Sequence, residues 1–191
     1  MNKRLFLPLL TALLVLLCAC APKPGPTLPQ ADYPLEFSFS SGAGAWSSNL
    51  TLNADGTFTG FYHDSDMGDV GTKYPNGTAY TCTFSGQFVS SEKLDEYSYR
   101  LQQTPITLEK PAGQEWIEDG IRYFSAGPHG LEGGLTFVLY TPDTPTAGLD
   151  EEFLSWWPGR FAETPSATLG CYGLWNVEAG TGFFTFPDGL M

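Results

Sequence analysis

The sequence is poor in basic residues. Nine Lys and Arg stand against 21 Asp and Glu, so the formal net charge is −12 over 191 residues. Domains that bind nucleic acid carry a basic patch that neutralises phosphates, and this composition supplies none. We therefore expect no nucleic-acid partner. The same charge repels anionic lipid headgroups, so the folded part of the chain has no electrostatic means of holding a membrane.

Histidine and catalytic motifs are almost absent. The two histidines are His63 and His129, and neither a Gly-x-Ser-x-Gly motif nor a Cys-x-x-Cys pair occurs. The glycine-rich segment 127–134, which holds His129 and Glu132, lacks the lysine of a phosphate-binding loop. These absences favour a binding or structural protein over an enzyme and predict no catalytic residue. A hydrolase that uses His63 or His129 with a nearby carboxylate is the least favoured alternative.

Cysteine is scarce as well. Beyond Cys18 and Cys20, only Cys82 and Cys171 remain. In an oxidising compartment these two can form a disulfide that closes a long loop. The alternative is a pair of buried free thiols, because free cysteine is among the most buried residue types. The sequence leaves both alternatives open.

The chain has one long apolar run, at its N-terminus. Lys3 and Arg4 precede the 13 residues Leu5–Leu17, which are apolar except for Thr11. A membrane-spanning helix needs about 20 such residues. A basic head followed by a short apolar core is instead typical of a signal peptide.

The residues that follow resemble a lipobox. Leu17-Cys18-Ala19-Cys20 places a branched aliphatic residue three before Cys20 and a small residue directly before it, as in bacterial lipoproteins. The resemblance implies that residues 1–19 are a lipoprotein signal peptide and that Cys20 carries acyl chains such as palmitate. Two or more chains hold a protein stably on a membrane. We therefore expect a lipid-anchored protein on the extracytoplasmic face of the cell membrane. The alternative is a secretory peptide cut near Ala19 or Ala21, which leaves a soluble protein.

Residues 20–34 are expected to form a tether. They hold five prolines and little that can be buried. Proline-rich segments adopt an extended conformation of about 3 Å per residue and act as spacers. No second linker or repeat follows, so residues 35–191 are predicted to form a single β-rich domain.

Alternating apolar residues predict a mostly β fold. Leu35, Phe37 and Phe39 show the period of two that is typical of a half-buried strand, and Asp55-Gly56 indicates a hairpin. A short helix near 150–157 is predicted between Asp150 as its cap and Pro158 as its stop. The pattern predicts an antiparallel β-barrel or a β-sandwich, of which we prefer the barrel. Further strands are expected near 49–53, 57–62, 79–84, 97–102, 106–108, 115–117, 121–124, 135–140, 171–177 and 182–186.

A second resemblance concerns residues 44–58. Gly44-Ala45-Trp46, followed by Asp55-Gly56-Thr57-Phe58, is similar to the opening hairpin of lipocalin-like bacterial envelope proteins. It implies a barrel whose closed end is plugged by Trp46 and whose interior holds a ligand. The Thr-Asp-Tyr motif of classical lipocalins is absent. The domain also resembles uncharacterised exported lipoproteins of Gram-positive gut bacteria, which implies no function.

Two groups of residues are candidate sites. Asp64, Asp66 and Asp69 lie within one short segment and offer oxygen ligands for Ca²⁺, the one cofactor we consider. The favoured alternative is a polar loop in which these residues supply turn geometry. Trp156 and Trp157 offer an aromatic surface for a ligand, although a small barrel also needs such residues in its core.

Three functions follow from these observations. The first is a lipid-anchored module that binds a small apolar molecule or a glycan in the barrel interior or on an aromatic patch. The alternative is a structural protein whose exposed apolar patch docks a partner protein of the cell envelope. A hydrolase comes last. If the interior of the barrel is filled by its own side chains, no ligand can bind there, and the binding hypothesis loses its barrel-interior site.

Overall fold

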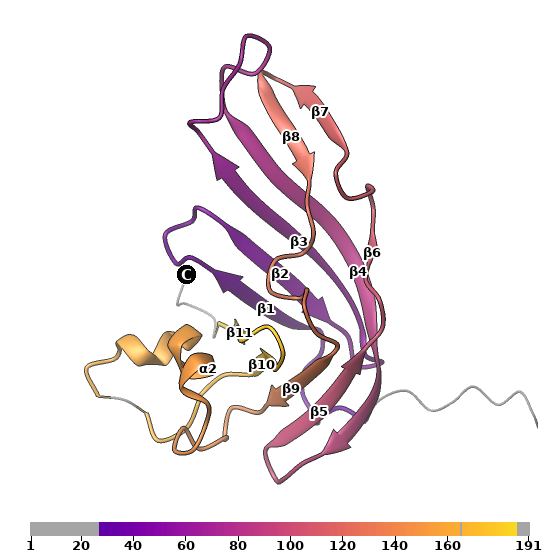
Figure 1. The fold of residues 1–191 in the computed structure, drawn as a ribbon. Helices are drawn as coiled ribbons and strands as arrows, with labels where there is room; N and C mark the ends of the chain where they lie inside the picture. Colours follow the sequence, from indigo (N-terminus) through magenta and orange to yellow (C-terminus); the bar gives the residue numbers. More distant parts are fainter. Residues whose placement is uncertain (1–26, 165, 187–191) are drawn as a thin grey trace, which may run out of the picture.

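The computed structural model describes residues 27–164 and 166–186, which form a closed antiparallel β-barrel of eight strands (Figure 1). Each barrel strand pairs with the next one along the barrel, and β1 pairs with β11 to close it. The predicted β-barrel is thereby confirmed. The barrel strands are β1 (Leu35–Ser40), β2 (Ser47–Leu52), β3 (Thr57–Asp66), β4 (Thr78–Lys93), β5 (Ser98–Gln103), β9 (Thr136–Tyr140), β10 (Gly173–Asn176) and β11 (Thr181–Thr185).

Local sequence explains the first hairpins. In β1 the alternating residues Leu35, Phe37 and Phe39 are buried while the residues between them are more exposed. The Asp55-Gly56 turn joins β2 to β3, with Gly56 at a φ of 83°. The Asp55 carboxylate accepts a hydrogen bond from the Thr57 backbone N–H at 2.9 Å, as expected for an Asx turn.

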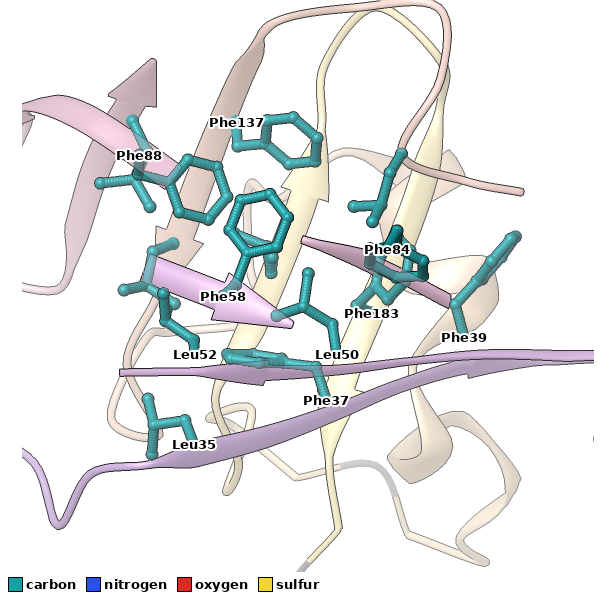
Figure 2. Packing of buried hydrophobic residues seen from close by; sticks show 14 of the residues in the cluster. Leu35, Phe37, Phe39, Leu50, Leu52, Phe58, Phe84, Phe88, Phe137 and Phe183 are labelled. Carbon is teal, nitrogen blue, oxygen red and sulfur yellow. The ribbon is translucent and has the colours of Figure 1, made fainter. Parts of the chain in front are cut away.

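The barrel interior is filled by its own side chains (Figure 2). Phe88 packs between Phe58 and Phe137, with ring centroids 5.1 and 5.4 Å apart. Gly86 lies opposite Phe58 across β3 and β4, and a Cβ there would come within 2.3 Å of the Phe58 ring. The expectation of a ligand cup inside the barrel is therefore wrong, because large apolar side chains occupy that space. Those with less than 2% exposure inside the barrel are Phe37, Leu50, Leu52, Phe58, Phe88, Leu101, Leu131, Phe137, Leu139, Leu174 and Phe183.

A second apolar cluster lies on the outside of the barrel, beneath α2 (Glu151–Trp156). The Asp150 carboxylate accepts a hydrogen bond from the Glu152 N–H at 2.8 Å, which confirms the predicted cap. Phe153 is fully buried against Trp175 and Phe184. A short 3-10 turn, Pro158–Phe161, follows the helix.

Both ends of the barrel are covered. At the end where β1 starts, which we call the tether end, Leu28, Ala31 and Tyr33 pack against the core. Pro29 is buried, and the Tyr33 hydroxyl donates a hydrogen bond to the Pro29 carbonyl at 3.0 Å. The packed domain therefore begins at Leu28 rather than at Leu35, because these apolar side chains cover the barrel mouth.

The segment 127–134, which we call the plug loop, covers the opposite end, the plug end. Leu131 is 1% exposed and inserts into the core. The Ser48 hydroxyl donates to the His129 carbonyl at 2.6 Å, and Asn176 Nδ2 donates to the Gly130 carbonyl at 3.1 Å. Trp46 packs here against His129, with ring centroids 5.0 Å apart. The loop is thus a fixed plug, held by polar groups of β2 and β10.

A four-stranded extension, which we call the wing, rises above the plug end (Figure 1). It consists of the distal parts of β3 and β4 together with β8 (Ile121–Ser125) and β7 (Glu115–Glu118). Strand β8 runs parallel to β4, and β7 pairs antiparallel with β8. Along one edge, β4 pairs with three strands in turn: β8, β6 (Thr107–Leu108) and β5.

Candidate ligand-binding site

The three aspartates proposed as metal ligands are engaged separately. Asp66 accepts hydrogen bonds from the N–H groups of Gly68 and Asp69, at 2.9 and 3.1 Å. Asp69 forms an ion pair with Arg122, and Asp64 accepts from the Ser65 N–H at 2.7 Å. Among the described residues, no group of three or more His, Cys, Asp or Glu is arranged to hold a metal ion. The structure therefore brings the three carboxylates to no common point: Asp64 and Asp66 lie in β3 rather than in the expected loop, and Asp66 fixes the turn that follows the strand.

The two adjacent tryptophans have different environments. Trp157 is 5% exposed, and its Nε1 donates to the Leu169 carbonyl at 3.0 Å, so it belongs to the outer apolar cluster. Trp157 therefore has little surface to offer a ligand. Trp156 is half-buried and lines a cavity of about 270 Å³ together with Arg160 and Phe161. It also packs edge-on against Phe39, at 4.7 Å between centroids.

Cys82 and Cys171 are both free and buried. Cys82 belongs to the cluster inside the barrel and Cys171 to the cluster outside it, so the barrel wall separates them. This explains why the disulfide alternative is not realised. Burial raises the pKa of each thiol to about 11, which keeps both protonated and unreactive near neutral pH.

The histidines also lie apart from an acid–base partner. His129 packs between Trp46 and Phe39, and within the described residues no hydrogen bond joins it to Glu132. His63 lies on the outer face of β3, where its Nδ1 is 3.1 Å from the Ser47 hydroxyl. This Ser–His contact was not expected from the sequence. Asn49 Nδ2 donates to the same hydroxyl at 3.1 Å. The Ser47 hydroxyl is therefore one of a row of polar groups on the outer face of β2 and β3.

A large hollow opens in the barrel wall at the plug end. The paired residues of β5 and β9 end at Gln102 and Thr136, and one further bond runs from the Gln103 N–H to the Leu135 carbonyl at 2.8 Å. Beyond it the chain diverges into segment 104–108 on one side and the plug loop on the other. Between them lies a pocket of about 540 Å³, which we call the lateral pocket. Its lining is mostly apolar and includes Pro105, Ile106, Leu108, Pro128, Leu131 and Leu135.

Gln103 is the polar residue at the wall of the lateral pocket. Its side chain is 4% exposed, and its Oε1 has no hydrogen-bond partner among the described residues. A buried carbonyl oxygen without a donor costs about 1–3 kcal/mol. Glu132 is the only charged residue in the lining, and it is exposed at the rim. The lateral pocket thus combines an apolar body, one unpaired acceptor and one negative charge.

Comparison with known proteins finds no match: no protein-family model, curated protein or solved structure corresponds to the chain. The lipobox, Cys20 and the signal peptide lie outside the described residues. In the part of the chain that the structure describes, no helix is both long and apolar enough to cross a membrane. The case for a function therefore depends on the lateral pocket and on the sequence before residue 27.

Proposed function

We propose that this protein is a lipid-anchored binding module of the extracytoplasmic membrane face, and that its lateral pocket holds a small, mostly apolar molecule. The observation that carries the proposal is the coincidence of an apolar pocket of about 540 Å³ with a buried lining residue, Gln103, whose side-chain oxygen is unpaired among the described residues. Ligand pockets of proteins have volumes of about 300–1,000 Å³ and combine an apolar lining with a few polar groups.

The unpaired acceptor defines the polar part of the ligand. An N–H or O–H group that reaches Gln103 Oε1 would relieve the cost of the buried oxygen, whereas an apolar or acceptor group would not. The carboxylate of Glu132 at the rim disfavours anions. The expected ligand is therefore neutral or cationic, with an apolar body and one hydrogen-bond donor.

The dye N-phenyl-1-naphthylamine has this chemistry, because it is neutral and carries two apolar ring systems with a single N–H. We expect it to bind with a saturable rise in its fluorescence. Gln103→Leu removes the acceptor and should weaken binding by about fivefold, the value of one net hydrogen bond of about 1 kcal/mol. Leu135 lies on the rim and is 47% exposed, so Leu135→Arg should abolish binding without disturbing the core.

Leu94→Arg is the matched control. Leu94 is 38% exposed in the turn between β4 and β5 and lies outside the lateral pocket. This variant should bind the dye as the native protein does. Failure of the dye to bind the native protein, or equal losses in Leu135→Arg and Leu94→Arg, would remove the lateral pocket as the binding site.

The anchor is tested separately, with the full chain in a bacterium that processes lipoproteins. We expect the native protein in the membrane fraction with an acylated Cys20. Cys20→Ser should release an intact soluble domain, because the folded part is acidic and has no other attachment. An N-terminus that begins elsewhere, or membrane retention of Cys20→Ser, would refute the anchor.

A further inference from the structure

The wing carries a cleft on its outer face that the lateral pocket does not involve. Strands β3 and β4 continue past the end of β2, whose pairing stops at Ser47 and His63. The extension exposes a sheet face that continues the outside of the barrel. A cavity of about 290 Å³ lies on that face, between β3 on one side and β7 with β8 on the other. We propose that this cleft binds a neutral saccharide.

Aromatic side chains form the two walls of the cleft. Phe61 of β3 is 44% exposed on one side. On the other side, Trp116 of β7 and Tyr123 of β8 are paired across the strands and stacked, with centroids 5.2 Å apart and an interplanar angle of 8°. The C–H groups of a sugar ring carry partial positive charge and pack against the negative faces of aromatic rings. Large apolar surface left exposed in this way needs an explanation.

Hydroxyl groups form the floor of the cleft. Thr81 and Thr83 are two residues apart on β4, so both side chains point to the outer face of the wing, with His63 and Phe61 as their partners on β3. Both residues belong to the lining, and Thr83 is exposed. Hydroxyls that can donate or accept match the hydroxyls of a sugar. Together, the walls and the floor supply both kinds of contact that a saccharide needs.

The charges at the rim exclude an anionic ligand. Glu109 and Glu118 outnumber Lys110 among the lining residues, and the chain as a whole carries −12. The Lys110 ammonium lies 4.5 Å from the centre of the Trp116 ring, so it is engaged with an aromatic face. Acidic polysaccharides would meet net repulsion. A neutral hexose or N-acetylhexosamine unit fits the cleft.

The segment that closes the cleft is fixed in place. The Glu109 N–H donates to the Thr83 carbonyl at 3.0 Å, and the Ser125 hydroxyl donates to the Lys110 carbonyl at 3.0 Å. The Gly113 N–H donates to the Ser125 carbonyl at 2.8 Å. The rim residues are therefore held before any ligand arrives, which reduces the entropy that binding costs.

The test is isothermal titration calorimetry of the purified protein with two neutral oligosaccharides, cellohexaose and chitohexaose, and with hexagalacturonic acid as the anionic comparison. We expect at least one neutral oligosaccharide to bind and the acidic one not to bind. Phe61→Ala and Tyr123→Ala should each weaken binding by about tenfold or more, because these two rings keep a face for the sugar, whereas Trp116 is engaged by Tyr123 and Lys110. Thr83→Val, which keeps the side-chain shape and removes the hydroxyl, should weaken it by about fivefold.

Ile117→Ala is the matched control, because Ile117 follows Trp116 on β7, is 46% exposed and points to the opposite face. It should leave saccharide binding unchanged. The proposal is overturned if neither neutral oligosaccharide binds at about 10 mM, a concentration that detects even weak single-sugar sites. The proposal is also overturned if Phe61→Ala and Ile117→Ala lose the same amount of saccharide affinity, or if hexagalacturonic acid binds more tightly than the neutral oligosaccharides. Phe61→Ala should still bind N-phenyl-1-naphthylamine, so the two sites are tested independently.

Discussion

The buried side chain of Asn176 makes more hydrogen bonds to the plug loop than any other residue that holds it. Asn176 is fully buried, and its Nδ2 donates to the carbonyls of Gly130 and Glu132, at 3.1 and 3.2 Å. Its Oδ1 accepts from the Ala179 N–H at 3.2 Å. One side chain therefore satisfies polar groups on both the plug loop and the β10–β11 turn. We expect Asn176→Ala to be one of the most destabilising substitutions in the domain.

The expected loss in the free energy of unfolding of Asn176→Ala follows from these three hydrogen bonds. A net hydrogen bond contributes about 1 kcal/mol, so the loss of three amounts to about 3 kcal/mol. The Gly130 carbonyl keeps a second donor, the Thr181 hydroxyl at 2.7 Å, which limits the cost there. Whole domains are stable by about 5–15 kcal/mol, so the variant should fold with a clearly lowered midpoint. Thr181→Val removes one of the bonds to the same carbonyl and should cost about 1 kcal/mol.

Urea unfolding followed by circular dichroism measures the loss. Hydrogen exchange adds a local readout, because the Leu131 N–H donates to the Pro128 carbonyl within the plug loop and should lose protection in Asn176→Ala. Asn49→Ala is the control: Asn49 is exposed and bonds only to the neighbouring Ser47 hydroxyl, so about 0.5 kcal/mol or less is expected. A cost below about 1 kcal/mol for Asn176→Ala, with Leu131 still protected, would refute the plug argument.

Three further predictions test other parts of the structure. Asp150→Ala removes the cap of α2 and should lower the free energy of unfolding by about 1 kcal/mol in thermal melts; an unchanged melting temperature would contradict it. The pKa of Cys82 and of Cys171 is raised from 9.0 to about 11, so the unfolded state loses these protons first and stability should fall as pH rises from 9 to 11. Both thiols should also resist a thiol reagent at pH 8 until urea is added, and rapid reaction of the native protein would show that they are accessible. Because Asp66 and Asp69 are engaged separately, Ca²⁺ at about 5 mM should leave the melting temperature unchanged, whereas a clear increase would restore the calcium hypothesis.

The strands and the helix could be predicted because their signals are local. The two-residue alternation of Leu35, Phe37 and Phe39 appears as burial in β1, and the Asp55-Gly56 turn lies where the sequence places it. Asp150 caps the helix as its side-chain chemistry predicts. These features depend on neighbours within a few residues. The predicted strand, turn and helix cap therefore appear in the structure where the sequence indicates them.

The pairing of distant segments could not be predicted in this way. The sequence indicates strands near 115–117 and 121–124, but not that they leave the barrel and extend β4 as a wing. The glycines of the plug loop are visible in the sequence, while the fixation of the loop by Asn176 from β10 is not. One signal was available for the lateral pocket. Gln103 continues the inward phase of Tyr99 and Leu101, and a polar residue at such a position calls for a partner.

The proposed anchor and the two proposed sites have a defined relation in space. The described chain begins at the tether end, where the Ser91 hydroxyl donates to the Thr27 carbonyl at 2.9 Å, whereas the lateral pocket and the wing lie at the plug end. With Cys20 as the anchor, residues 20–27 would reach about 25 Å if extended. With that proposed anchor, we expect the tether end to lie nearer the membrane than either site. Cellohexaose should therefore bind the lipidated protein in vesicles and the Cys20→Ser protein in solution with affinities within about twofold of each other. Clearly weaker binding to the vesicle-bound form would mean that the cleft faces the lipid and that the proposed orientation is wrong.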